Sequence, residues 1–169
     1  LATDAEILLM DEAFSALDPL IRSEMQNILL DLQSELHKTI IFITHDLDEA
    51  LKIGDRIAIL RDGSMVQDSD PQEIIMNPAD EYVSDFIKDI NRARVIQAKS
   101  IMTPTNTKSS GATVKEDMVL EDILQIMSDA PSKPVTIENS KGKITGKIEM
   151  VNLIEGMKRP KSLGTNITG

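Results

Sequence analysis

Two adjacent carboxylates, Asp11 and Glu12, directly follow a run of four apolar residues at 7–10. A short apolar run bounded by polar residues is typical of a buried central strand in a parallel sheet. Ligands of open α/β sheets bind just beyond the carboxyl ends of the strands, where this strand would place both carboxylates. Carboxylate oxygens suit a divalent metal and can also activate water. The pattern therefore predicts metal-assisted hydrolysis of a nucleotide phosphate.

Two further polar segments follow in order, Ser-Ala-Leu-Asp at 15–18 and Ile-Thr-His-Asp at 43–46. Each feature has a plain structural explanation when it is taken alone. A carboxylate pair often lies exposed at a strand end, Asp18 suits a helix N-cap, and a single histidine such as His45 is usually an ordinary polar residue after a strand. The agreement of all three segments in order and spacing favours a functional interpretation.

The three segments together resemble the ATP-binding-cassette (ABC) ATPases. Residues 7–12 are similar to the Walker B strand of that family, residues 15–18 to its D-loop, and His45 to its switch histidine. Two longer runs, 7–22 and 42–56, resemble the ATPase subunit of bacterial glycine betaine/proline (quaternary amine) importers.

This resemblance implies a role for each matching residue. Asp11 would hold Mg²⁺, through water, and Glu12 would act as the general base that polarises the attacking water. His45 would contact the γ-phosphate of ATP and sense its loss. Ser15 and Asp18 would contribute to nucleotide binding from the D-loop, and Asp18 would contact the opposite subunit across a dimer interface.

The sequence lacks the other phosphate-binding motifs of such an ATPase. No G-x-x-x-x-G-K-[ST] loop occurs, and the LSGGQ-type signature is absent. Gly142 and Gly146 precede Lys147, but the glycines are too close together, so a turn and a strand are the better interpretation. Because the chain also begins with Leu1, we expect the C-terminal part of a longer ATPase, and we expect this part alone to be inactive in ATP hydrolysis.

The composition favours a soluble cytoplasmic protein. The 169 residues include no cysteine and only two histidines, which excludes disulfides and argues against structural zinc. No apolar run approaches the length of a membrane span, and no secretory signal is visible. The net charge of −10, with one tyrosine and no tryptophan, provides neither a basic stripe nor a stacking platform. We therefore expect no nucleic acid partner.

Residues 1–92, over which the resemblance extends, show the strand and helix alternation of the catalytic half of an α/β nucleotide-hydrolase core. Asp18 and Pro19 predict a helix start, Asp46 begins a capping-box pattern, and Asp62-Gly63 predicts a hairpin turn. The expected strands are 7–10, 39–44, 56–60 and 64–67, and the expected helices are 20–36, one from Asp46 to near Gly54 as its C′ residue, 71–76 and 79–90.

Residues 93–112 are polar, rich in turn formers and without periodicity, which predicts a linker. A β-α-β-β-α pattern follows over 113–157, and 158–169 is predicted to be a loose tail. This order resembles a CBS domain, a small regulatory α+β module. Residues 98–104 are similar to its opening segment, and 143–153 to its final strand and helix.

The resemblance to a CBS domain implies an adenosine site that this chain alters. Such domains usually bind adenosine compounds with a Ser/Thr and an Asp at the start of the last helix, where this chain has Glu149 and Asn152. Glu149 would repel an anionic phosphate. A nucleotide sensor and a purely structural or dimerising module therefore both remain open.

The expected fold class is α/β, the C-terminal part of a P-loop ABC ATPase core followed by a small α+β CBS-like domain. The resemblance implies the ATP-hydrolysing, energy-coupling subunit of a bacterial importer for glycine betaine/proline or related quaternary amines, in osmoprotection, peripheral at the cytoplasmic face of the cell membrane. Its implied partners are a second ATPase subunit, an inner-membrane permease and, indirectly, a periplasmic or lipid-anchored substrate-binding protein. The alternative is a non-catalytic CBS-type regulatory or dimerisation module on an inert ATPase remnant.

Overall fold

The computed structural model describes residues 5–36 and 38–158, and the chain divides into two compact units between Ile57 and Ala58. The predicted tail lies outside the described residues from residue 159 onward. Within the described ranges, no helix is long and apolar enough to cross a bilayer.

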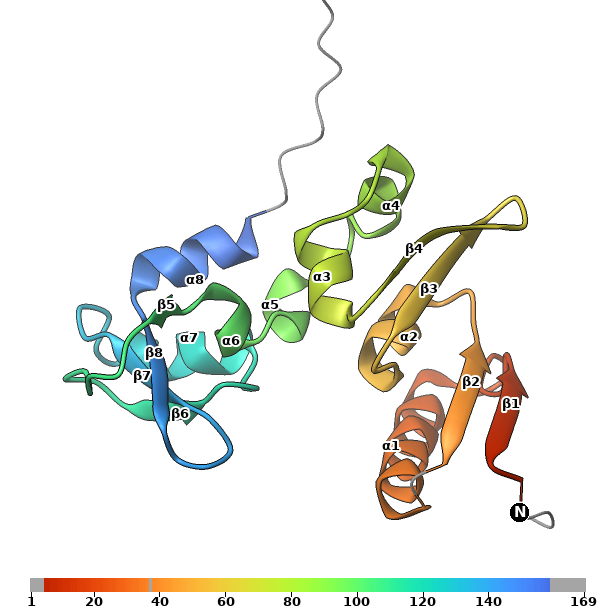
Figure 1. The fold of residues 1–169 in the computed structure, drawn as a ribbon, viewed down its shortest axis with the longest axis horizontal. Helices are drawn as coiled ribbons and strands as arrows, with labels where there is room; N and C mark the ends of the chain where they lie inside the picture. Colours follow the sequence, from red (N-terminus) through yellow and green to blue (C-terminus); the bar gives the residue numbers. More distant parts are fainter. Residues whose placement is uncertain (1–4, 37, 159–169) are drawn as a thin grey trace, which may run out of the picture. The chain divides into compact units, whose positions relative to one another are not determined.

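The first unit is a β-α-β-α arrangement (Figure 1). Its elements are β1 (Ile7–Asp11), α1 (Pro19–Leu36), β2 (Thr39–Ile43) and α2 (Leu47–Ile53). β1 and β2 pair in parallel, with Ile7 opposite Thr39 and Asp11 opposite Ile43. The parallel pair predicted from the sequence is thus confirmed, and both strands end at the same edge.

Both helices of this unit begin at aspartate caps. Asp18 Oδ1 accepts hydrogen bonds from the amides of Leu20 and Ile21, both at 3.1 Å. Asp46 Oδ1 accepts one from the amide of Glu49 at 3.2 Å. These side chains satisfy amide donors that have no partner inside a helix. The predicted helix starts are therefore confirmed, and each cap closes a loop that carries candidate site residues.

The end of α2 differs from the prediction. Gly54 has φ −82°, so it is not the left-handed residue that commonly follows a helix. A Cβ atom at this position would lie 2.9 Å from the carbonyl oxygen of Ala50. The glycine is required here by close backbone approach and not by a positive φ.

The first strand, predicted to be buried, is covered on one face only in this chain. Alternate side chains of β1 and β2 face solvent, with exposed fractions of 59% for Ile7, 64% for Leu9, 51% for Ile41 and 47% for Ile43. Side chains of successive strand residues point to opposite faces, and only one face of this two-stranded sheet is covered. On the covered face, the ring of Phe14 packs against that of Phe42 at a centroid distance of 5.5 Å.

A hairpin of β3 (Ile57–Arg61) and β4 (Ser64–Ser69) lies at the start of the second unit, apart from Ile57, which is the last residue of the first. Its turn residues Asp62 and Gly63 have φ values of 51° and 77°, as a type I′ turn requires. The predicted hairpin is therefore confirmed. Four short helices follow, α3 (Pro71–Met76), α4 (Glu81–Phe86), α5 (Arg92–Val95) and α6 (Ala98–Ile101).

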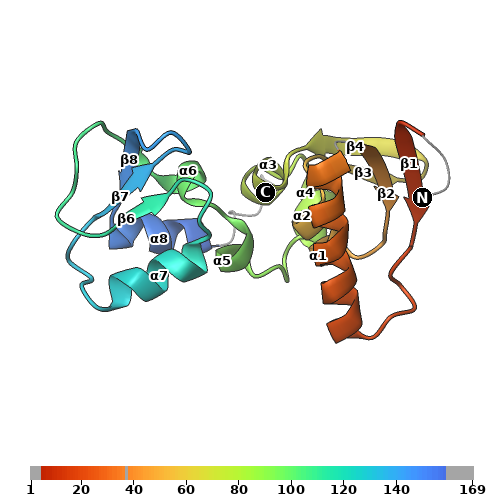
Figure 2. The same cartoon turned by 90° about the horizontal axis from the view of Figure 1, so that it is seen from below.

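A four-stranded sheet of order β5-β8-β7-β6 completes this unit. Its strands are β5 (Thr103–Pro104), β6 (Thr113–Lys115), β7 (Val135–Glu138) and β8 (Ile144–Ile148). β6 pairs with β7 in parallel, while β8 is antiparallel to both β7 and β5. Helices α7 (Leu120–Ser128) and α8 (Met150–Met157) lie on one side of the sheet (Figure 2). The β-α-β-β-α order predicted for 113–157 is the order observed.

The segment predicted to be a linker carries ordered structure in its first half. Residues 93–104 include most of α5, all of α6 and the edge strand β5, which pairs with β8. Ile96 and Ala98 are fully buried. Isolated apolar residues in a polar stretch give no periodic signal, so the sequence alone does not reveal their packing.

Candidate active site

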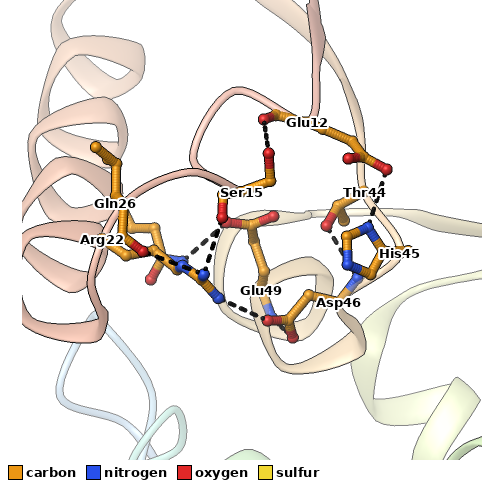
Figure 3. A network of polar contacts seen from close by, with 9 residues as sticks. Glu12, Ser15, Arg22, Gln26, Thr44, His45, Asp46 and Glu49 are labelled. Atoms are coloured by element: carbon orange, nitrogen blue, oxygen red, sulfur yellow. Dashed lines mark hydrogen bonds and ion pairs between the residues drawn. The ribbon is translucent and has the colours of Figure 1, made fainter.

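The ends of β1 and β2 bring two of the predicted catalytic residues into contact (Figure 3). The amide of Glu12 donates a hydrogen bond to the carbonyl of Ile43 at 2.8 Å, which continues the pairing of β1 with β2 by one residue. The two loops therefore leave the sheet at the same edge. His45 Nδ1 lies 2.9 Å from Glu12 Oε1. A carboxylate and an imidazole at this distance can share a proton or orient one another.

The backbone of Glu12 adopts an unusual conformation. Its φ is +43°, in the left-handed region that residues other than glycine rarely occupy. Ser15 holds this turn, because its amide and its hydroxyl both donate hydrogen bonds to the Glu12 carbonyl, at 3.1 and 2.9 Å. Strained conformations that the surrounding structure maintains are concentrated at functional sites. The conformation is consistent with a functional role for Glu12.

Ser15 and Asp18, the predicted D-loop residues, have local partners within the first unit. The Ser15 hydroxyl contacts the Glu12 carbonyl, and the Asp18 carboxylate caps α1. Both contacts shape the loop between β1 and α1. Contacts of these two residues with a nucleotide or with an opposite subunit remain predictions.

Asp11 is an exposed side chain at the last position of β1. Within residues 5–36 and 38–158, no group of three or more carboxylate, histidine or cysteine side chains is arranged to coordinate a metal ion. Mg²⁺ needs no such cage, since it keeps several waters and commonly takes one or two carboxylates together with substrate phosphates. The exposed carboxylate of Asp11 fits the predicted role of holding Mg²⁺ through water.

Behind the exposed pair lies a network that sequence reasoning missed. Arg22 of α1 contacts the Asp46 carboxylate, with 3.2 Å between Nη1 and Oδ2. Deeper in the unit, Gln26 Nε2 donates a hydrogen bond to Glu49 Oε1 at 3.0 Å, and both residues are buried. The one available signal was the position of Arg22 and Gln26 four residues apart on a predicted helix, which places them on one face.

The start of α8, where the CBS resemblance would place a ligand, is occupied by contacts within the chain. Asn152 Oδ1 accepts a hydrogen bond from the amide of Glu149 at 2.9 Å. Lys147 Nζ lies 2.6 Å from Glu149 Oε1 and balances part of its charge. A shallow pocket beside these residues is lined by Pro131, Ser132, Pro134, Glu149, Met150 and Val151.

No protein-family model matches the chain, but curated proteins do. The glycine betaine/carnitine transport ATP-binding protein GbuA of Listeria monocytogenes is 63% identical over 102 residues, covering 60% of this chain and 26% of the relative. The glycine betaine/proline betaine transport system ATP-binding protein ProV of Escherichia coli is 55% identical over 105 residues, covering 62% and 26%. The trimethylamine N-oxide transport system ATP-binding protein TmoW of Pelagibacter ubique is 43% identical over 156 residues, covering 91% and 45%.

A solved structure, that of cbiO1 from Clostridium perfringens, described as part of the ABC transporter complex cbiONQ, is 30% identical and covers 49% of this chain and 32% of its own. Its TM-score of 0.39 is too low for the likeness to bear on the fold.

The chain spans less than half the length of the curated relatives described above. The sequence relatives confirm the predicted resemblance: this chain is homologous to part of the ATP-binding proteins of ABC transporters. Within that class, its strong homologues are ATP-binding proteins of glycine betaine and proline betaine transport.

Proposed function

We propose that this chain is part of the ATP-hydrolysing subunit of a bacterial ABC importer for glycine betaine/proline or related quaternary amines, in osmoprotection. The contact between Glu12 and His45 at the ends of two parallel strands carries the proposal. The relatives support it, because GbuA is named as an ATP-binding protein for transport of glycine betaine and carnitine, ProV for glycine betaine and proline betaine, and TmoW for trimethylamine N-oxide.

In this proposal Glu12 accepts the proton of the attacking water, and His45 orients Glu12. A histidine that uses Nδ1 towards the carboxylate leaves Nε2 available for the γ-phosphate of ATP. Proton transfer to a positioned carboxylate typically accelerates a reaction by ~10²–10⁴-fold. Asp11 would hold Mg²⁺ through water, and the bound ion would neutralise charge on the phosphates.

The full reaction needs groups that residues 1–169 do not contain. A phosphate loop, whose backbone amides cradle the phosphates, is absent from this sequence. We therefore expect the chain by itself to be inactive. The partners in the proposal are a second ATPase subunit, an inner-membrane permease and, indirectly, a periplasmic or lipid-anchored substrate-binding protein, with the ATPase peripheral at the cytoplasmic face of the membrane.

Residues 113–157 enter the proposal as a CBS-like regulatory or dimerising module that follows the ATPase part in the sequence. Their β-α-β-β-α order supports this assignment. The contacts of Lys147 and Asn152 with Glu149 favour a structural or dimerising role over a conventional nucleotide site.

The decisive experiment is ATP hydrolysis by the full-length subunit, assembled with its permease in lipid vesicles. We expect hydrolysis that rises when glycine betaine and a binding protein are supplied. The same vesicles without permease control for uncoupled activity. Absence of hydrolysis in the full-length assembly would contradict the proposal and favour the alternative, a non-catalytic module on an inert remnant.

A further inference from the structure

The side chain of Arg22 joins the two loops that carry Glu12 and His45. From the first turn of α1 it reaches Asp46 with Nη1, at 3.2 Å. With Nη2 it donates to two carbonyl oxygens of the preceding loop, that of Leu17 at 3.3 Å and that of Ser15 at 3.4 Å. Figure 3 shows the contacts of Arg22 with Ser15 and Asp46. A planar guanidinium can hold several acceptors in a fixed arrangement, which a lysine ammonium cannot reproduce.

Asp46 uses its two carboxylate oxygens for separate purposes. Oδ1 caps α2 by accepting from the amide of Glu49, and Oδ2 contacts Arg22. Its backbone amide donates to the hydroxyl of Thr44 at 3.0 Å. The hydrogen bond between Thr44 and Asp46 spans His45, and Asp46 has further contacts with Glu49 and Arg22.

These contacts close a ring around the candidate active site. Ser15 bonds the Glu12 carbonyl, the Glu12 carboxylate contacts His45, and Asp46 follows His45 in the chain. Arg22 then connects Asp46 back to the carbonyl of Ser15. The Arg22 side chain thus adds a second connection between the two loops, beside the direct hydrogen bond from the Glu12 amide to the Ile43 carbonyl.

The two ion-pair contacts in this ring differ in how far their side chains are exposed to solvent. The side chains of His45 and Glu12 are 73% and 49% exposed, whereas those of Arg22 and Asp46 are 30% and 34% exposed. Contacts between exposed charges are weak and easily rearranged, so the Glu12–His45 pair does not fix its own geometry. The pair of Arg22 and Asp46 is the better shielded of the two.

One atom of Arg22 lies in an unfavourable position. Among the residues that the structure describes, its Nε is buried without a hydrogen-bond partner. An unsatisfied buried donor destabilises a fold, so each one calls for an explanation. The explanation for the unsatisfied Nε is that Nη1 and Nη2 contact acceptors on two different loops, which fixes the orientation of the guanidinium.

We propose that Arg22 is a positioning residue for ATP hydrolysis, which locks the loop at 12–18 to the His45 segment through Asp46. This inference rests on the proposed function. Arg22 does not touch the reacting atoms, so its loss reduces the rate of the chemical step and leaves binding of ATP largely intact.

The test uses the full-length subunit with four variants, Arg22→Gln, Arg22→Lys, Asp46→Asn and the double variant Arg22→Gln/Asp46→Asn. Asparagine keeps the cap of α2 while it removes the charge that faces Arg22. We expect Arg22→Gln to lower kcat about 10-fold with KM for ATP changed less than about two-fold, since small displacements of catalytic groups act on the chemical step. Arg22→Lys should recover part of the loss, and the double variant should be no slower than Arg22→Gln.

Lys52→Gln is the matched control. Lys52 Nζ contacts the carbonyl and hydroxyl of Ser23, at 3.3 and 3.1 Å, and so also joins α1 to α2. It contacts neither the loop at 12–18 nor Asp46 in any of these hydrogen bonds. Its removal should leave kcat unchanged.

Hydrogen exchange gives a readout that does not depend on hydrolysis. The amides of Ser15 and Leu17 donate to the carbonyls of Glu12 and Phe14, both at 3.1 Å. They should exchange faster in Arg22→Gln and at the wild-type rate in Lys52→Gln, with similar melting temperatures in both variants.

Unchanged exchange and unchanged kcat in Arg22→Gln would overturn the positioning role. Additive losses in the double variant, or an equal loss in Lys52→Gln, would also overturn it. Absence of hydrolysis by the wild-type subunit would instead refute the proposed function, and the exchange rates would still decide whether Arg22 holds the loop.

Discussion

Nε of Arg92 donates a hydrogen bond of 3.1 Å to the carbonyl oxygen of Gly156, 64 residues further along the chain. The same guanidinium donates through Nη1 to the carbonyl of Ile75, in α3. Gln72, also in α3, donates to the carbonyl of Val95 at 2.7 Å. Helix α5 is therefore hydrogen-bonded to both α3 and α8, within the second unit.

Replacement of Arg92 by alanine should destabilise the second unit. Burial lowers the pKa of the Arg92 guanidinium, but arginine remains protonated at neutral pH. The variant leaves the carbonyls of Ile75 and Gly156 without this donor, which should reduce the free energy of unfolding by about 1–3 kcal/mol. Chemical denaturation measures the loss.

Arg94→Ala is the control for this effect. Arg94 contacts Glu121 at 3.1 Å, as an exposed ion pair. Such pairs contribute about 0–1 kcal/mol, so this variant should unfold close to wild type. Equal losses for the two arginine variants would show that the buried hydrogen bonds of Arg92 contribute nothing specific.

Glu12→Gln in the full-length subunit should abolish turnover and still allow ATP to bind and hold a closed dimer. Glutamine keeps the shape of the side chain but cannot accept the proton of the attacking water. We expect kcat to fall by ~10²–10⁴-fold, as for loss of a general base. Glu24→Gln, an exposed change on α1, serves as control. Near-normal turnover in Glu12→Gln would exclude this residue as the base.

His45→Ala should impair hydrolysis with little effect on folding. The side chain is exposed, and its one described hydrogen bond is to Glu12. Surface changes of this kind usually alter stability by less than about 0.5 kcal/mol. Thermal melts and ATPase rates of the same preparation separate the two effects. A large drop in melting temperature would show that His45 is a structural residue.

The isolated chain should self-associate through the open face of β1 and β2. Leu9 and Ile41 lie opposite each other on this face, and both are exposed. Apolar surface on strands with unpaired edges favours association. The double variant Leu9→Thr/Ile41→Thr should scatter less light at equal concentration. The matched change at Leu8 and Ile40, on the covered face, should instead lower the melting temperature.

Adenosine monophosphate should bind the second unit poorly. Glu149 and Asn152 stand at the start of α8, and the Asn152 side chain is used to bond the Glu149 amide. Neither the hydroxyl nor the aspartate expected of an adenosine site is available there. Calorimetric titration of the chain with AMP checks this, and tight micromolar binding would show that these residues do not disable the site.

Local chemistry determined much of this protein from its sequence. Asp18 followed by Pro19 starts a helix, Asp46 caps another, and Asp62-Gly63 turns a hairpin, because each depends only on neighbouring backbone groups. The sequence also predicted that Asp11 and Glu12 follow a strand of a parallel sheet, because a short apolar run that ends in polar residues indicates such a strand.

Only the tertiary structure decided which faces are covered and which distant groups meet. Leu9 reads as a buried strand residue, yet its exposure depends on whether another element packs over that face. Arg22 and Asp46 are 24 residues apart, and no local pattern links them. Ile96 lies in a polar segment, yet it is fully buried at the end of α5, where its carbonyl accepts a hydrogen bond from the amide of Leu120. Such contacts depend on how whole elements pack, which neither periodicity nor capping signals encode.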